Sequence, residues 1–363
     1  MRAVRPLGRL ILVSLFIVLG TSIFLRADVD DSSQWVVQTS GIDTNLRGVS
    51  VAMSSDSRRH LGPGAPVVWA SGSNGVILQS KDLGKTWKRL SVAGGETLDF
   101  RGIQARDANV AYLMSSGDGD KSRIYKTTDG GGNWKLQYSD KRKGFFLDAL
   151  ICASNANNDC YALSDPIGGK FVILNTKDGE NWMELGSDHM PAALSGEGAF
   201  AASGTCLSVR NGRELTFVTG GPAARVFHSS DGGRSWTAGN TPIVSGNASS
   251  GIFSTAFHGR LAVVVGGDYQ DASKPERVAA YSLDNGKSWK LAEQQPRGYR
   301  SAVTWIADQT LVAVGPNGED LSSDGGARWK PTGSLNLNAL AALDSTHVWA
   351  VGPNGTVARM TNR

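Results

Sequence analysis

One short motif occurs six times in this 363-residue chain, and its repetition constrains the fold more than any other feature. The clearest copy is "SSDGGRSW" at residues 229–236, which contains a hydroxyl residue, an Asp two positions later, a glycine turn and a Trp. The Asp–Trp pairs of the six copies are Asp82 and Trp87, Asp129 and Trp134, Asp178 and Trp182, Asp231 and Trp236, Asp284 and Trp289, and Asp324 and Trp329. The Asp residues are 40 to 53 residues apart. A period of this length indicates one small sheet per repeat.

Each repeat contains four short runs with strand character. Two apolar runs separated by a glycine-rich turn precede the motif, and another short run follows its Trp. A further run that opens with a bulky residue comes first, at 46–51, 100–105, 146–151, 200–205, 253–258, 299–304 and 337–342. Alternating β-branched and aromatic residues bounded by Gly, Asn, Asp and Pro are typical of strands and hairpin turns. We therefore predict an all-β fold, a seven-bladed β-propeller of four-stranded blades.

The two ends of the chain together predict the seventh blade. Residues 347–363 contain two strands and stop where a motif is due. Residues 28–38 contain Asp30 and Trp35, whose spacing equals that of Asp82 and Trp87. The N-terminal strand is thus expected to complete the C-terminal blade, so that residues 28–363 form one ring without a free sheet edge.

The residue types in the motif predict a structural role. An Asp in a tight turn accepts hydrogen bonds from nearby backbone N–H groups, and Gly supplies the positive φ angle of the turn. A Trp buries a large face between sheets. Seven of the ten Trp residues lie at this position. We expect the motifs to stabilise blades rather than bind a ligand or metal, and we expect no cofactor.

The first 27 residues differ in kind from the rest. Arg2, Arg5 and Arg9 precede an apolar run at 10–25, and Ala27 follows. This pattern is typical of a secretory signal peptide, because the apolar run is short for a spanning helix. The bulky Leu25 near the expected cleavage position keeps an uncleaved anchor as the alternative. The predicted location is secreted or periplasmic.

Net charge bears on the class of partner, and the cysteines bear on a possible disulfide. The net charge of +4 equals the number of arginines in the first 27 residues, so the ring itself is balanced, and we expect no nucleic-acid partner. Cys152 and Cys160 flank a polar turn and are candidates for a disulfide, with Cys206 unpaired. Three buried reduced cysteines are the alternative.

The repeats resemble those of Asp-box, or bacterial neuraminidase repeat, propellers. Units that open with "LRGV" or "FRGI" and close with "SSDGGRSW", after an N-terminal signal, are similar to the photosystem II stability and assembly factor family, over residues 34–363. This resemblance implies a single seven-bladed ring without catalysis. It also implies that an arginine-rich face binds a membrane-protein assembly intermediate.

Three arginines suggest such a face in this chain. Arg47, Arg101 and Arg300 each occupy the second position of an expected inner strand, and Asn338 occupies the same position in the blade between them. Arginines on adjacent blades converge near the central channel, where guanidinium groups suit carboxylates. The alternative is that they pair with nearby carboxylates and hold the blades together.

The predicted function is a non-catalytic, monomeric scaffold for a protein partner, such as an envelope or membrane-protein complex. The alternative is a carbohydrate-active enzyme or sugar-binding propeller, which needs facing carboxylates or exposed aromatic rings. Asp148 and Glu197 are the candidate carboxylate pair, and Tyr299 with Glu197 is an incomplete sialidase set. Trp69, Trp305 and Trp349 lie outside the motifs, and their apolar strands favour core packing. No dinucleotide fingerprint follows a strand.

Overall fold

The computed structural model describes Met1 and residues 34–38, 40–53, 66–153 and 159–361. The predicted signal segment after Met1, and Asp30, lie outside these described residues. Within the described residues, no helix has both the length and the apolar character needed to cross a membrane.

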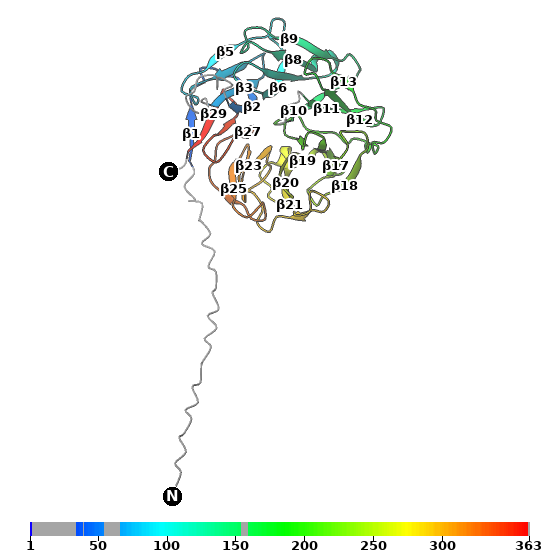
Figure 1. Cartoon of the computed structure of the whole chain (residues 1–363), viewed down its shortest axis with the longest axis vertical. Helices are drawn as coiled ribbons and strands as arrows, with labels where there is room; N and C mark the ends of the chain where they lie inside the picture. The colour runs from blue at the N-terminus through cyan, green and yellow to red at the C-terminus, as the bar shows by residue number, and fades with distance from the viewer. Residues whose placement is uncertain (2–33, 39, 54–65, 154–158, 362–363) are drawn as a thin grey trace. The chain divides into compact units, whose positions relative to one another are not determined.

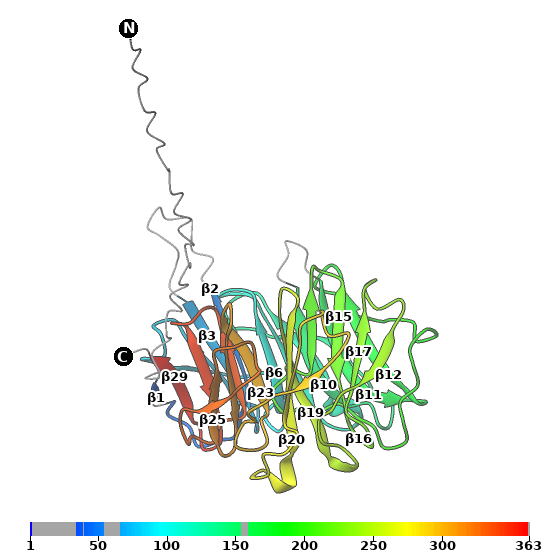
Figure 2. The ribbon, with the colours of Figure 1, turned by 90° about the horizontal axis from the view of Figure 1, so that it is seen from below.

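Seven antiparallel sheets form a ring, as predicted, and the chain runs round it once (Figure 1). The first strand of each sheet contacts the first strands of both neighbouring sheets, and this innermost circle lines the central channel. These strands are β2 (Leu46–Met53), β6 (Asp99–Ala105), β10 (Leu147–Cys152), β14 (Leu207–Arg210), β19 (Asn247–His258), β23 (Ala302–Ala307) and β27 (Ala339–Ala342). Seen edge-on, the strands run between the two faces of the ring (Figure 2).

The remaining strands follow outward in chain order, except that β1 is the outermost strand of the last blade. The second strands are β3 (Pro66–Gly72), β7 (Ala111–Ser116), β11 (Cys160–Ile167), β15 (Glu214–Val218), β20 (Leu261–Asp268), β24 (Thr310–Gly315) and β28 (Val348–Val351). The third are β4 (Ile77–Ser80), β8 (Arg123–Thr127), β12 (Lys170–Thr176), β17 (Arg225–Ser229), β21 (Ala279–Ser282), β25 (Gly318–Ser322) and β29 (Val357–Thr361). The outermost are β5 (Lys88–Leu90), β9 (Lys135–Ser139), β13 (Met183–Glu184), β18 (Thr237–Asn240), β22 (Lys290–Leu291), β26 (Lys330–Pro331) and β1 (Gln34–Gln38). The short β16 (Gly220–Gly221) adds to the fifth blade by pairing with β19.

The ring closes as predicted, by joining the two ends of the chain. Strand β1 pairs antiparallel with β29, from Gln34 opposite Thr361 to Gln38 opposite Val357. In Figure 1 the blue β1 therefore lies beside the red β29. The N-terminal strand supplies the outer edge of the last blade, so both ends of the ring are held by backbone hydrogen bonds.

The repeated motif folds as a tight turn between the third and fourth strands. In residues 229–236, the Asp231 carboxylate accepts the N–H of Ser235 at 2.9 Å and the hydroxyls of Ser229 at 2.8 Å and Ser235 at 2.6 Å. Gly233 has a φ of 85°, which a residue with a side chain rarely adopts. Asp82, Asp129, Asp178, Asp284 and Asp324 accept the equivalent bonds. The hydrogen bonds of the motif Asp are therefore made within its own turn.

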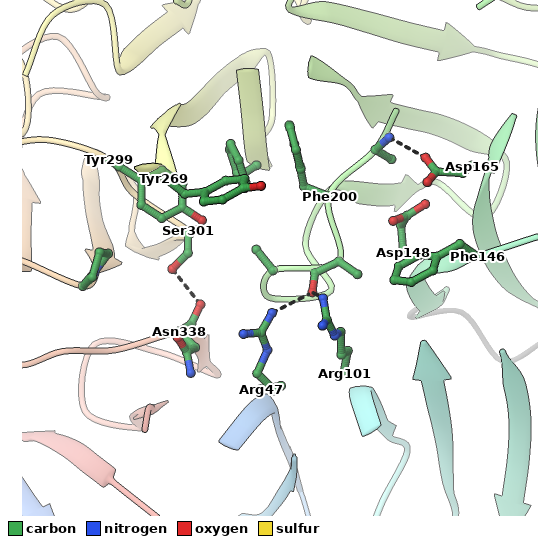
Figure 3. A pocket seen from close by; sticks show the side chains of 15 residues that line it. Arg47, Arg101, Phe146, Asp148, Asp165, Phe200, Tyr269, Tyr299, Ser301 and Asn338 are labelled. Atoms are coloured by element: carbon green, nitrogen blue, oxygen red, sulfur yellow. Dashed lines mark hydrogen bonds between the residues drawn. The ribbon is translucent and has the colours of Figure 1, made fainter. Parts of the chain in front are cut away.

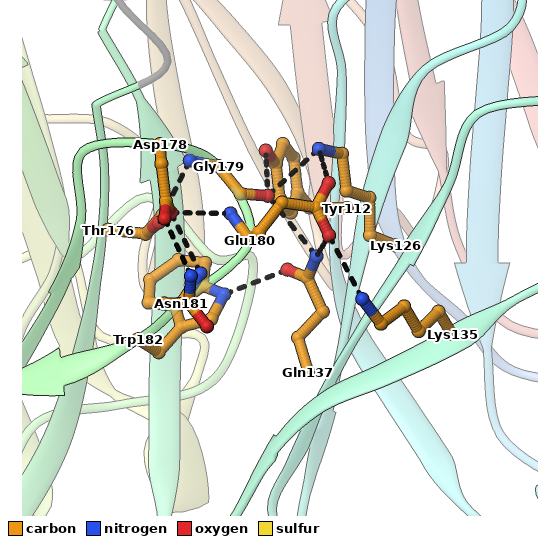
Figure 4. A network of polar contacts seen from close by, with 10 residues as sticks. All are labelled: Tyr112, Lys126, Lys135, Gln137, Thr176, Asp178, Gly179, Glu180, Asn181 and Trp182. Atoms are coloured by element: carbon orange, nitrogen blue, oxygen red, sulfur yellow. Dashed lines mark hydrogen bonds and ion pairs between the residues drawn. The ribbon is translucent and has the colours of Figure 1, made fainter.

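Contacts at these motifs join neighbouring blades. Trp182 packs edge-on against Tyr112 of the preceding blade, with ring centroids 6.2 Å apart, and its indole N–H donates to the Gln137 side chain at 2.9 Å. The Glu180 carboxylate accepts from Lys126 at 2.5 Å and Lys135 at 3.3 Å, across the same boundary (Figure 4). Packing and ion pairs at the rim thus hold the blades in register.

The structure differs from the sequence prediction in the fourth blade. Residues 200–205, predicted as the inner strand, form an irregular loop, and β14 begins only at Leu207. The loop turns into the channel because the Phe200 ring stacks on Phe253 of the fifth blade, 3.8 Å away at 8°. Its hydroxyls also bond to other blades, Ser203 to the Ser301 carbonyl at 2.8 Å and Thr205 to the Ser254 hydroxyl at 2.7 Å. We call residues 199–205 the channel loop.

Candidate functional site

The channel loop divides the central channel into two cavities. The cavity on one side, of about 490 Å³, is lined by Arg47, Arg101, Asp148, Asp165 and aromatic rings, and we call it the arginine cavity. The cavity on the other side, of about 440 Å³, is lined by Ser203, Gly204 and Thr205 of the loop and by the inner strands. A third cavity, of about 590 Å³, shares Asp165 and Phe200 with the arginine cavity. The arginine cavity has the size of a small-ligand site.

Two arginines from adjacent blades meet in this cavity (Figure 3). Arg47 of β2 and Arg101 of β6 both donate to the carbonyl of Ala201 in the channel loop, at 3.2 and 3.4 Å. Arg101 is also ion-paired with Asp99 at 2.7 Å. Arg47 has no carboxylate within ion-pair distance among the described residues, and its buried Nε has no hydrogen-bond partner there. Arg47 is therefore the cation in this cavity that lacks a counter-ion.

The environment of Arg47 is electrostatically unfavourable for a charge. Burial, followed by the nearby Arg101, lowers the pKa of Arg47. A guanidinium stays protonated in proteins at any ordinary pH, so Arg47 remains a desolvated cation. A carboxylate placed against both arginines would relieve this cost through planar, paired hydrogen bonds.

Two acidic side chains lie on another side of the cavity (Figure 3). Asp148 of β10 is 1% exposed, and Asp165 of β11 accepts the N–H of Ala199 at 3.0 Å. Burial, together with the adjacent Asp165, raises the pKa of Asp148 well above its usual value. Burial raises the pKa of Asp165 to about 6. Both carboxyl groups thus keep their proton to a higher pH than an exposed Asp does.

Aromatic rings form the remaining wall. Phe253 stacks on Phe200 and meets Tyr299 edge-on at 4.7 Å, and the partly exposed Tyr269 meets Phe200 at 6.5 Å. Burial raises the pKa of Tyr299, so its hydroxyl stays protonated. Phe146 lies against the Arg101 guanidinium at 5.9 Å. The cavity therefore combines apolar rings with charged groups of both signs.

The structure brings together only part of the arginine-rich face predicted from sequence, which comprised Arg47, Arg101, Arg300 and Asn338. Arg300 precedes β23 and turns into its own blade, where it is fully buried and ion-paired with Asp320. It does not line the arginine cavity. Asn338 does line it, but its side-chain amide bonds to Asn45 and the Leu46 carbonyl, both at 2.7 Å, which ties the last blade to the first.

The predicted carboxylate pair, Asp148 and Glu197, is not brought together in one cavity. Glu197 is bonded to Arg225 and to the Thr219 hydroxyl at 2.6 Å, and it lines the third cavity. Tyr299 lies in the arginine cavity, apart from Glu197. The partner of Asp148 is instead Asp165, which the sequence analysis did not identify. The signal for it was a charged residue inside the apolar strand "CYALSDPI".

The other candidates have structural surroundings. Trp69 and Trp349 are fully buried in the core, and Trp305 lines the cavity on the far side of the channel loop. A disulfide joins Cys152 and Cys160, which end β10 and begin β11, and Cys206 is buried. Among the described residues, no group of three or more His, Cys, Asp or Glu side chains is placed to hold a metal ion.

Comparisons with known proteins support the fold. Similar solved structures include YCF48 from Cyanidioschyzon merolae, at 15% identity and a TM-score of 0.64, covering 90% of this chain and 98% of that one. A structure described as YCF48 bound to D1 peptide is 16% identical with a TM-score of 0.63, covering 91% of this chain and 97% of that one. No protein-family model matches the chain, and no curated protein matches it. At this level of identity the likeness shows that the chain has the fold of the YCF48 propellers.

Proposed function

We propose that this chain is a non-catalytic, protein-binding propeller whose arginine cavity holds the C-terminal end of a partner protein. The observation that carries this proposal is Arg47, a half-buried cation that forms no ion pair with any described carboxylate and lies beside the second guanidinium of Arg101. The channel loop lies between this cavity and the one on its other side, so a chain end can occupy the cavity without passing through the channel. A terminal carboxylate fits two guanidinium groups in this geometry.

Two further observations support the partner class and the compartment. The solved YCF48 holds a D1 peptide, so a propeller with this fold binds a peptide. The Cys152–Cys160 disulfide is of the kind that persists in oxidising compartments, and it agrees with the signal peptide predicted at residues 1–27. We therefore place the ring outside the cytoplasm as a monomer, where an envelope or membrane-protein complex would be its partner.

The test uses peptides that differ only at their C-terminus. An array of random decapeptides is displayed with free carboxylates and, in parallel, as C-terminal amides. We expect binding only to free carboxylates, and at least about a tenfold weaker affinity when Arg47→Ala and Arg101→Ala are combined, since an ion-paired hydrogen bond contributes about 1.5–3 kcal/mol. Arg89→Ala, at an exposed position of β5, is the matched control. Equal binding of amides, or by the double variant, would contradict the proposal.

A glycoside hydrolase is the second candidate, and the Asp148–Asp165 pair is the observation that favours it. Burial raises the pKa of both carboxyl groups, so the pair offers a general acid. Hydrolysis also needs an ionised nucleophile or base, and Asp165, with a pKa of about 6, is largely ionised at pH 7 and would take this role. Release of fluorophore from 4-methylumbelliferyl glycosides, abolished by Asp148→Asn, would favour this function over the scaffold.

A further inference from the structure

Asp148 is a buried acid without a hydrogen-bond donor. Its side chain is 1% exposed, and neither carboxyl oxygen has a hydrogen-bond partner in the part of the chain that the structure describes. The backbone N–H of Asp165 lies close enough to favour the ionised form, but it donates to the Phe146 carbonyl at 3.0 Å. A buried polar group without a partner costs free energy. A hydrogen-bond donor placed against Asp148 would therefore be favourable.

Asp148 lines the same cavity as Arg47 and Arg101. The Asp148 and Asp165 carboxyl groups lie beside one another in Figure 3, to one side of Arg47 and Arg101. The charged or titratable groups that act on Asp148 are Asp165, Arg101 and the buried Cys206 thiol, and the others lining the cavity are Arg47, Tyr269 and Tyr299. One ligand can therefore reach the half-buried Asp165 and the arginines together, and it reaches the fully buried oxygens of Asp148 when that side chain moves.

We infer that the arginine cavity selects a chain end that carries a basic side chain, with the terminal carboxylate on Arg47 and Arg101 and the cation on Asp148 and Asp165. This inference rests on the proposed function and specifies its ligand. An ammonium or guanidinium group supplies the donors that Asp148 lacks, and the aromatic wall attracts cations as well. A metal ion would need more ligands than this pair provides.

The charge state of the pair links binding to protons. Burial raises the pKa of Asp165 to about 6 and that of Asp148 well above its usual value. A cation that pairs with these groups favours their ionised forms, so binding releases protons. The affinity for a basic peptide should thus rise with pH, most steeply where the free pair is still protonated.

The experiment uses N-acetylated pentapeptides with a free C-terminal carboxylate and Lys at the last, second-last or third-last position. Each peptide has a twin with norleucine, which keeps the aliphatic chain without the charge, and a twin with a C-terminal amide. Titration calorimetry at pH 7.5 gives the affinities. We expect the best Lys peptide to bind at least about tenfold more tightly than its norleucine twin, the effect of one charged hydrogen bond.

Single-residue variants separate the two halves of the cavity. Asp148→Asn and, independently, Asp165→Asn should abolish the preference for Lys over norleucine and keep the preference for carboxylate over amide. Arg47→Ala should abolish the preference for carboxylate. Asp188→Asn, at an exposed loop position, should change neither preference. Thermal unfolding of each variant checks that it is folded. If Asp148→Asn does not fold, Asp165→Asn alone tests the acidic half of the cavity.

Three outcomes would overturn the inference. Equal affinity for Lys and norleucine peptides, with carboxylate still preferred over amide, would reject the acidic half and leave the proposed function intact. Failure of every pentapeptide to bind would reject both. Binding of free L-lysine as tight as that of the best pentapeptide would assign the cavity to an amino acid rather than to a chain end.

Discussion

Charged side chains at the outer rim have hydrogen-bond and ion-pair partners within the protein, whereas some of those in the arginine cavity lack them among the described residues. At the rim, the Asp of each repeated motif accepts hydrogen bonds from its own turn, as Asp231 does. Glu180 forms ion pairs with two lysines (Figure 4). In the cavity, Asp148 has no donor and Arg47 has no carboxylate among the described residues. Charges that the fold satisfies internally stabilise it, whereas charges left unsatisfied at a cost are the ones available to a ligand.

Arg300 gives the sharpest test of this difference between paired and unpaired charges. It belongs to the arginine-rich face predicted from sequence, but it is buried and ion-paired. Arg300→Ala should lower the free energy of unfolding by about 3–5 kcal/mol, since it leaves Asp320 charged and unpaired in the core. Peptide affinity per folded molecule should not change. Urea unfolding and peptide titration measure the two quantities.

The matched control for Arg300 removes both charges. Arg300→Met combined with Asp320→Leu should recover much of the lost stability, because an apolar pair of similar volume replaces a buried ion pair at little cost. A single variant that stays as stable as the wild type but loses peptide binding would return Arg300 to the binding face.

The rim predicts a smaller effect on stability. Asp231→Ala removes the acceptor for the Ser229 and Ser235 hydroxyls and the Ser235 N–H, and the cost should be about 1–2 kcal/mol, as for a lost helix cap. The urea midpoint measures it, with Asp188→Ala as the control at an exposed position. A loss no larger than that of the control would mean that the motif does not stabilise its blade.

Features that depend on contacts local in the sequence could be predicted from it. The motifs were predictable because their hydrogen bonds are local, so that spacing in the chain determines the turn. Arg47 and Arg101 were predictable because both occupy the same position near the start of an inner strand, at a bulge in β2 and in β6. Closure by β1 followed from a count of strands.

The failures arose where contacts are distant in sequence. Arg300 precedes its strand, which begins at Ala302, so the register argument did not apply to it. The channel loop resembles a strand in composition, but stacking of Phe200 on Phe253 draws it into the channel. Asp165 reaches the cavity from a second strand, and no repeat pattern predicts that position.

The last prediction is that the two regions respond to pH with opposite sign. Hydrogen bonds from Thr86 lower the pKa of Asp82 to about 2, so the fold favours its ionised form. The stability from Asp82 is then fully present above the pKa of the unfolded chain, near 4, and is lost as the pH falls toward 2. Burial raises the pKa of Asp165 to about 6, so the stability from its neutral form is present below about pH 4 and is lost as the pH rises through 6.

Thermal unfolding of Asp82→Asn and Asp165→Asn between pH 2 and 8 checks these signs. Asp82→Asn should destabilise the ring at pH 7, and its difference from the wild type should vanish toward pH 2. Asp165→Asn should stabilise the ring at pH 8 by on the order of 1 kcal/mol and match the wild type below pH 4, because an amide is never charged and still accepts the Ala199 N–H. Loss of stability in both variants at pH 8 would show that the ionised Asp165 is paired within the protein. The cavity would then hold no unmet charge at that position, and the contrast with the rim would rest on Arg47 and Asp148.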